Sequence, residues 1–237
     1  MVDFASVRAI DFHTHAEEPC CDHRDDGYNE FQAGMAAYFK NPAGAKGMLP
    51  TVQDTANYYR ERNIAAVIFP VDAERETGFR RYSNEEVAGI CAENDDILIP
   101  FASVDPHKGK AGAREVRRLV RLKYSNPMYL DDVAVDFPDM KIILAHPSFP
   151  WTEEGLAVAQ HKPNVYYDMS GWSPKYFPET FIRYANSILK KKMLFGSDWP
   201  AITPDRWLAD FEAAPFKDEV RPLILKENAM RLLGETV

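Results

Sequence analysis

The chain has 237 residues, a formal net charge of −8 and a hydrophobic fraction of 46%. This length suits one α/β barrel of about 250 residues, and the composition is typical of a globular protein. The acidic balance leaves no basic excess to neutralise phosphates, which argues against nucleic acid or an anionic membrane as a partner.

The N-terminal segment, residues 1–6, lacks the charged-then-apolar pattern of a secretory signal, and no run of about 18 apolar residues follows it. Three cysteines, Cys20, Cys21 and Cys91, do not make a disulfide scaffold. The absence of a CxxC spacing also argues against a metal site in the loop that holds Cys20, Cys21 and His23. We therefore expect a cytoplasmic protein.

The first predicted element is a short buried strand over residues 8–13, which ends at His13 and is followed two residues later by His15. Because strand side chains alternate, His13 and His15 project to the same side. Two neutral imidazoles are costly to bury without a partner, and a divalent cation is a suitable one. The alternative is a pair of hydrogen-bonded histidines at a strand end, and the motif alone does not decide between them.

Helices and strands alternate along the next part of the chain, after a Gly- and Pro-rich connection over residues 41–50. Thr51 and Ser83 each begin a capping box, which predicts helices to about residues 63 and 94. Continuous apolar runs at residues 64–71 and 97–104 predict strands covered on both faces. This order predicts a parallel sheet built from βαβ units.

Strands and helices alternate in the second half of the chain as well. Strands are predicted over residues 141–145, 164–169 and 193–197. Helices are predicted over residues 128–137, 178–191 and 222–233, with another that begins at Pro204 behind the N-cap Thr203. Gly234 suits a helix C-cap, and the run Lys190, Lys191 and Lys192 is interpreted as a solvated helix C-terminus.

Six strands result, and the simplest interpretation is a single domain over residues 1–237. One region breaks the rhythm, because residues 105–140 contain helical patterns at 111–120 and 128–137 but no convincing strand between them.

Ionisable side chains follow nearly every predicted strand, where parallel α/β folds gather their functional groups. They are His13, His15, Asp72, Asp105, His107, His146, Asp168 and Asp198. His13, His15 and Asp198 are suitable donors for zinc or another divalent ion, which would lower the pKa of a bound water toward about 7. Asp198 could accept the proton of that water, and His146 could polarise a substrate oxygen or shuttle a proton.

Each of these residues also has a purely structural interpretation. Asp198 could form an Asx-turn, and His146 could be satisfied by a backbone carbonyl. Asp168 and Asp105 suit turns or the orientation of a metal ligand, whereas His107 and His161 lie in polar settings and are expected to be solvated. Aromatic residues after the late strands either line an apolar pocket or cover the rim of the core: Phe149, Trp151, Trp172, Tyr176, Phe177 and Trp199.

Four motifs occur in the order in which one known family carries them. They are Asp-Phe-His-Thr-His (11–15), Leu-Ala-His-Pro-Ser (144–148), Phe-Gly-Ser-Asp-Trp-Pro (195–200) and Glu-Asn-Ala-Met-Arg-Leu-Leu-Gly (227–234). The set resembles the amidohydrolase-related metal-dependent hydrolases, specifically the branch with aminocarboxymuconate-semialdehyde decarboxylase and γ-resorcylate decarboxylase.

The resemblance implies a (β/α)₈ barrel with one divalent metal, zinc first and manganese as the alternative. It implies that His13 and His15 are the first-strand metal ligands, that Asp198 is the last-strand ligand and that His146 is the acid/base or substrate-polarising group. The expected function is hydrolysis or non-oxidative decarboxylation of a small carboxylated, aromatic or acyl substrate, through a metal-activated water or a metal-bound substrate.

The chain departs from this family between residues 104 and 141, where two βα units of roughly 50 residues seem to be deleted near residues 120–121. The fourth and fifth strands and one metal-ligating histidine would be missing with them. We therefore expect a TIM-barrel-like α/β fold with about six of its eight strands and a weakened metal site, open to strand exchange in a homo-oligomer. The alternative function is a catalytically impaired relative that acts as an interaction or assembly protein.

Overall fold

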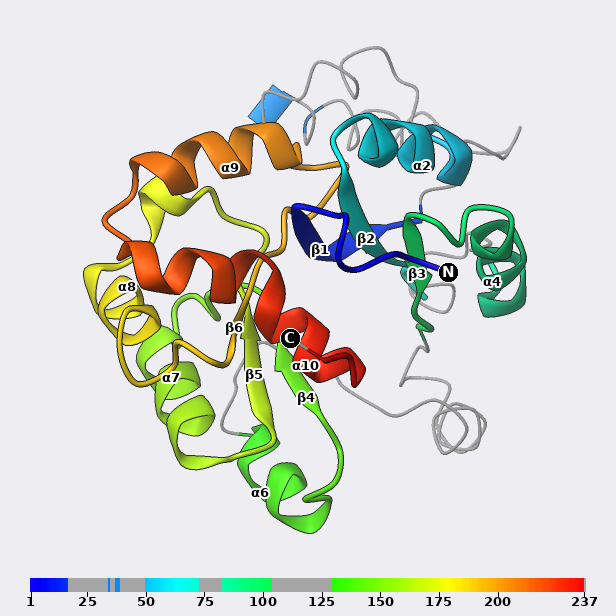
Figure 1. The fold of residues 1–237 in the computed structure, drawn as a ribbon. Helices are drawn as coiled ribbons and strands as arrows, with labels where there is room; N and C mark the ends of the chain where they lie inside the picture. The colour runs from blue at the N-terminus through cyan, green and yellow to red at the C-terminus, as the bar shows by residue number, and fades with distance from the viewer. Residues whose placement is uncertain (17–33, 35–36, 39–49, 73–81, 104–128, 237) are drawn as a thin grey trace. The chain divides into compact units, whose positions relative to one another are not determined.

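The structure is a computed structural model that describes residues 1–16, 34, 37–38, 50–72, 82–103 and 129–236 (Figure 1). The chain divides into two compact units, and each is described by itself. The first unit comprises residues 1–6, 14–123 and 199–201, and the second comprises residues 7–13, 124–198 and 202–237. Several predicted features lie outside the described residues: Cys20, Cys21, His23, Asp105, His107, the helix at 111–120 and the junction near 120–121.

Three strands form the sheet of the first unit, in the order β1-β2-β3. β1 (Ala9–His15) adds its last residues to this unit, and β2 (Ile64–Phe69) runs parallel to β3 (Leu98–Pro100) with Ala66 opposite Leu98. All residues of β2 up to Ile68 are buried, which explains its uninterrupted apolar sequence.

Both capping boxes expected from the sequence are present at the helices of this unit. At α2 (Val52–Glu61), the Thr51 hydroxyl accepts from the Asp54 amide at 2.9 Å, and the Asp54 carboxylate accepts from the Thr51 amide at 3.0 Å. At α4 (Asn84–Ala92), Ser83 and Glu86 make the same reciprocal pair at 3.0 and 2.7 Å. Two N–H groups at each helix start are therefore satisfied.

The second unit contains the sheet β4-β5-β6, whose strands are all parallel. The strands are β4 (Ile142–Leu144), β5 (Val165–Asp168) and β6 (Met193–Leu194). The α-helices are α6 (Tyr129–Asp136), α7 (Thr152–His161), α8 (Glu179–Ala185), α9 (Pro204–Ala213) and α10 (Asn228–Leu233). Single turns of 3₁₀ or π-helix are η3 (Pro174–Tyr176), η4 (Asp218–Val220) and η5 (Leu223–Glu227).

The first residues of β1 belong to this second unit. The Phe12 amide donates to the Phe195 carbonyl at 2.8 Å, and the Asp198 amide donates to the His13 carbonyl at 2.9 Å. The core beside these bonds is aromatic, because the buried Trp207 ring lies 4.6 Å from the Phe195 ring and 5.0 Å from the Phe211 ring. Strand β1 is thereby fixed next to the segment that follows β6.

Helix α8 ends six residues earlier than its predicted end at residue 191, so this prediction was wrong. The Asn186 carboxamide caps the chain reversal by donating to the Pro215 carbonyl and accepting from the Lys217 amide, each at 2.9 Å. Lys192 consequently does not lie at a solvated helix end. Its ammonium donates to the Ala159 and Lys162 carbonyls at 2.6 and 2.5 Å, at the end of α7.

Helix α7 had no counterpart among the predicted elements. Its N-cap is Trp151, which makes no side-chain capping bond, so the usual start signal is missing from the sequence. Glu153 and Glu154 in its first turn are the remaining signal, because carboxylates suit the positive end of a helix.

The Asn164 side chain is expected to matter for stability out of proportion to its size. It is buried, and its Nδ2 lies 3.0–3.1 Å from the Ala134, Phe137 and Met140 carbonyls, so its two N–H groups are shared among three acceptors at the end of α6 and the turn after it. Asn164→Ala should lower the free energy of unfolding by about 1–3 kcal/mol, because the buried Ala134 carbonyl and the part-buried bonds to Phe137 and Met140 lose their donor. Denaturant unfolding measures this, and the exposed Asn57→Ala variant should differ little from wild type.

The expected α/β class with parallel strands is confirmed, and six strands occur among the described residues. In the described parts of the chain, no helix combines the length and the apolar character needed to cross a membrane.

Candidate metal centre

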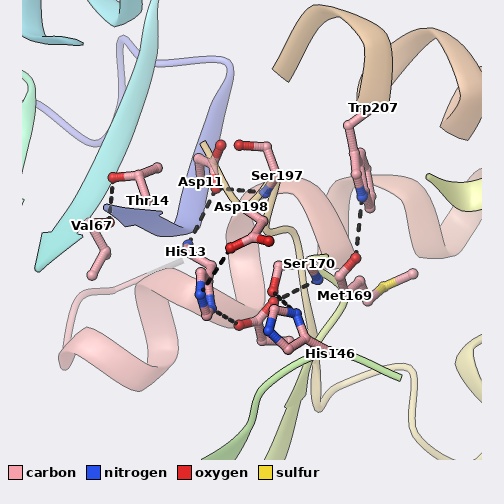
Figure 2. Close-up of polar contacts among 11 residues, drawn as sticks. Asp11, His13, Thr14, Val67, His146, Met169, Ser170, Ser197, Asp198 and Trp207 are labelled. Atoms are coloured by element: carbon pink, nitrogen blue, oxygen red, sulfur yellow. Dashed lines mark hydrogen bonds and ion pairs between the residues drawn. The ribbon is translucent and has the colours of Figure 1, made fainter. Parts of the chain in front are cut away.

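The site in the second unit is built around His13, near the end of β1. Its side chain is buried, and its Nδ1 lies 2.5 Å from Oδ2 of Asp168, the last residue of β5 (Figure 2). The Asp168 carboxylate accepts from the Nδ1–H group, so this contact fixes both the ring orientation and the tautomer of His13. When the ring is neutral, the lone pair of His13 is then at Nε2.

The Nε2 atom of His13 lies 3.4 Å from Oδ1 of Asp198. This separation exceeds the usual N–H···O distance of about 2.9 Å. It agrees with the roughly 3.4 Å between two atoms that each bind a tetrahedral zinc ion at about 2.0–2.1 Å. The pair therefore fits two ligands of one divalent cation.

Asp11 supports this pair from within β1. Its buried carboxylate accepts from the Ser197 amide at 2.9 Å and from the His13 amide at 3.2 Å, which ties the segment before Asp198 to the strand. The sequence prediction did not single out Asp11. The signal was present, because alternation along the strand places Asp11 on the same side as His13.

Charges around His13 work against the effect of burial. Burial alone would lower the pKa of the imidazole, but the charge and hydrogen bond of Asp168, with the charges of Asp198 and Asp11, raise it to about 9. For Asp168, burial works toward a higher pKa, and the charge and hydrogen bond of His13 outweigh it, so the pKa of the carboxyl is lowered. Without a metal, His13 and Asp168 thus form an ion pair at neutral pH.

These two pKa shifts make the stability of the metal-free fold depend on pH. The pKa of His13 is raised from 6.5 to about 9. The ion pair therefore contributes its full stabilisation to the metal-free fold below about pH 6.5, and this stabilisation is lost as the pH rises through about 9. Because the pKa of Asp168 is lowered from 3.8, the same gain is lost again when the pH falls through its folded-state value.

We expect Asp168→Asn to lower the pKa of His13 in the metal-free protein from its wild-type value of about 9, because burial remains while the charge and hydrogen bond of Asp168, the strongest of the effects that raise the pKa, are lost. NMR titration of histidine-labelled protein after chelator treatment measures this pKa. Asp139→Asn, which changes an exposed carboxylate, is the matched control and should leave it at its wild-type value. An unchanged pKa in Asp168→Asn would contradict the assignment of Asp168 as the partner of His13.

His146 lies two residues after the end of β4 and faces the same group of residues. Its ring centroid is 5.1 Å from that of His13, and its Nδ1 is 3.1 Å from the Ser170 hydroxyl. His146 and Asp198 both have left-handed backbones, with φ values of 63° and 69°. Such conformations cost about 1–3 kcal/mol in residues other than glycine and concentrate at functional sites, which favours a functional role for both residues.

Two glycines make room for these side chains. A Cβ on Gly196 would collide with Oδ1 of Asp168 and lie 3.1 Å from the His13 Cβ, and a Cβ on Gly171 would collide with Nδ1 of His146. Gly171 also has a φ of 71°, which glycine adopts without cost. The close approach of the two imidazoles to these segments therefore depends on the absence of side chains at both positions.

The structure brings together His13, Asp198 and His146 of the predicted site residues, within the second unit. His15 belongs to the first unit, where its amide donates to the Trp199 carbonyl at 2.8 Å and its ring lies edge-on to Phe69 at 5.0 Å. Its role as a metal ligand stays a prediction.

The remaining candidates take other places. His161 is exposed at the end of α7, as expected, and Asp72 is buried in the first unit. Among the aromatic residues, Phe177 is buried against Phe181 and Trp207, so it is part of the core. The ring of Phe149 is exposed and lies 5.4 Å from that of Trp172.

Comparison with known families supports the relationship that the motifs suggest. Residues 120–234, close to half of the chain, match the sequence model of a family described as amidohydrolase. This part of the chain is therefore similar to the amidohydrolase family, as the motifs are. It contains His146, Asp168 and Asp198, whereas His13 and His15 lie before the matched residues.

A curated protein to which the chain is similar is Protein fluG from Emericella nidulans. The two are 28% identical over 95 residues, which cover 38% of this chain and 11% of the relative. The chain thus matches only about a tenth of the length of that protein.

Solved structures extend the likeness over almost the whole chain. An uncharacterized TIM-barrel protein from Bordetella bronchiseptica is 20% identical with a TM-score of 0.75, covering 95% of this chain and 98% of that one. The 5-carboxyvanillate decarboxylase from Sphingomonas paucimobilis is 12% identical with a TM-score of 0.60, covering 98% and 100%. The 2,6-dihydroxybenzoate decarboxylase from Rhizobium is 15% identical with a TM-score of 0.53, covering 96% and 99%.

At these identities the likeness shows the fold alone. The expected TIM-barrel-like fold is confirmed, with six strands among the described residues where a complete barrel has eight. The predicted deletion near residues 120–121 lies outside the described residues and stays a prediction.

Proposed function

We propose that the chain is a divalent-metal-dependent amidohydrolase-family enzyme that hydrolyses, or decarboxylates without oxidation, a small carboxylated substrate of aromatic or acyl type. The observation that carries this proposal is the arrangement around His13. One ring nitrogen is held by Asp168 at 2.5 Å, and the other lies 3.4 Å from the Asp198 carboxylate. A carboxylate that orients an imidazole whose second nitrogen faces another anionic donor is a typical metal-ligand arrangement.

The proposed ligands are His13, His15 and Asp198, with zinc as the first choice and manganese as the alternative. Three protein ligands leave a position for substrate or water, as in catalytic zinc sites. When bound, such a cation supplies Lewis-acid polarisation of an oxygen and lowers the pKa of a coordinated water.

The protein groups have distinct tasks in this proposal. Asp168 keeps the proton of His13 on Nδ1, so that Nε2 remains a ligand atom. His146 exchanges a proton with the substrate, and Asp198 is the second proton acceptor beside it. The buried carboxylate of Asp168, bonded to Nδ1 of His13, also stabilises positive charge at the proposed metal centre.

Decarboxylation is the activity to assay first. Two of the solved structures that share the fold are decarboxylases of aromatic carboxylates, by their names. In such a reaction the carbon that loses CO₂ must gain a proton, and His146 is a protein group that can provide one.

The test combines metal analysis with a substrate panel. In the presence of excess zinc or manganese the chain should bind one divalent ion, and the metal-loaded protein should release CO₂ from 2,6-dihydroxybenzoate or 5-carboxyvanillate, or hydrolyse simple amides and esters. Protein that binds no divalent metal and turns over none of these compounds would contradict the proposal. Tight stoichiometric zinc would contradict the weakened site expected from the deletion.

The alternative, an impaired relative that serves as an assembly protein, depends on the region of the predicted deletion, which lies largely outside the described residues. Oligomer size measured on the same sample tests it, because a monomeric, metal-loaded and active chain would exclude this alternative.

A further inference from the structure

The loop between β4 and α7, residues 145–151, carries His146 on a costly backbone. His146 and Ser148 have left-handed φ values of 63° and 56°. Neither residue is glycine, so both conformations are unfavourable by themselves and persist only where the surrounding structure enforces them. The contacts that enforce them therefore also determine where the ring of His146 lies.

The first residue of α7, Thr152, makes one of these contacts. A threonine that caps a helix accepts from a backbone N–H group of that helix. The buried hydroxyl of Thr152 instead donates to the Pro147 carbonyl at 2.7 Å, back across the loop. Within the same loop, the Trp151 amide donates to the Ser148 carbonyl at 2.6 Å. The two residues that follow His146 are thus both held by hydrogen bonds from the start of α7.

Helix α7 gives the Thr152 hydroxyl a fixed position. Leu156 and Ala159 of this helix are buried in the core of the second unit, and the Gly155 amide donates to the Trp151 carbonyl at 3.0 Å. The β-branched side chain of Thr152 also has few rotamers. The hydroxyl is therefore a rigid anchor for the loop.

The ring of His146 tolerates little displacement from its position in the site. Its centroid lies 5.1 Å from that of His13 (Figure 2), and any Cβ on Gly171 would collide with its Nδ1. A displacement of about 1 Å in a catalytic group can lower a reaction rate about 100-fold. A bond that holds the loop after His146 therefore affects the chemistry of that residue.

We propose that Thr152 is a positioning residue, whose hydroxyl bond to the Pro147 carbonyl holds the left-handed loop of residues 146–148 and thereby keeps the His146 ring beside His13. The effect on catalysis depends on the proposed function, whereas the placement of the ring does not. Thr152 itself touches no reacting atom, and its effect passes through His146.

The experiment compares Thr152→Val, which keeps the shape of threonine without the hydroxyl, with Thr152→Ser, which keeps the hydroxyl. NMR of the zinc-loaded chain, labelled at its 6 histidines, detects the nuclear Overhauser contact between the rings of His13 and His146. Each ring is assigned by the signals that its glutamine variant loses. The contact should be present in wild type and Thr152→Ser and lost in Thr152→Val.

Kinetics on the same variants separate positioning from general damage. In Thr152→Val, kcat should fall about 10- to 100-fold while KM and zinc content change little. Thr152→Ser should restore kcat. Thr51→Val is the matched control, because it also removes a hydroxyl bond at a helix start, to the Asp54 amide at 2.9 Å, but in the first unit. It should keep the ring contact and the wild-type kcat.

A ring contact that survives in Thr152→Val, or one that is also lost in Thr152→Ser, would overturn the proposal. The NMR readout needs no turnover. An inactive wild type whose ring contact is lost in Thr152→Val and kept in Thr152→Ser would therefore count against the proposed function and still support the role of Thr152 in placing His146.

Discussion

Asp198→Ala is expected to lower the zinc affinity of the chain by about 100- to 1000-fold. Four-ligand zinc sites bind with roughly 10–16 kcal/mol, so one ligand accounts for about a quarter of that free energy. The variant also loses a second effect of Asp198 on the site. In wild type, its carboxylate lies 3.4 Å from Nε2 of His13 and contributes to the raised pKa of that residue. Competition with a chromophoric zinc chelator at fixed pH measures the affinity.

The control for this prediction is Asp139→Ala, which removes an exposed carboxylate from the same unit and should leave zinc affinity unchanged. Equal affinities of wild type and Asp198→Ala would exclude Asp198 as a ligand. They would also remove the basis for the proposed metal centre, since the His13–Asp198 pair is its central observation.

His146→Gln is expected to reduce kcat by about 10²- to 10⁴-fold, the usual contribution of a positioned general acid or base. Glutamine retains much of the shape and polarity of histidine but cannot exchange a proton. Zinc content should remain at its wild-type value, because His146 is not one of the proposed ligands. Steady-state kinetics on the best substrate of the panel, together with metal analysis, measure both quantities.

His161→Gln is the matched control, since His161 is exposed at the end of α7. It should have wild-type kcat and KM. If His146→Gln keeps the wild-type kcat, another group must exchange the proton. The left-handed backbone at residue 146 would then have no role in catalysis.

The sequence was most informative where the signal is local. The capping boxes at Thr51 and Ser83 are complete within four residues each, and both are present in the structure. The buried strands β1 and β2 were predicted from their own apolar sequences. Alternation within β1 also predicts that His13 and His15 share a side, which is a property of any strand.

What the sequence could not provide is the pairing of residues that lie far apart along the chain. His13 and Asp168 are 155 positions apart, and their contact follows only from the placement of β1 and β5. The same is true of Lys192, whose ammonium reaches carbonyls at the end of α7. Helix α7 was missed because its start lacks a capping side chain.

Strand β1 has a consequence for how the protein is made. Its residues Phe12, His13 and His15 bond to the backbone of Phe195, Asp198 and Trp199, which the ribosome adds more than 180 residues later. During most of synthesis these bonds cannot form, so this part of β1 stays unpaired until the segment after β6 has been made. Since non-local pairing is slow and waiting strands aggregate, we expect the yield of native protein in cells to depend on chaperones and on low temperature during expression.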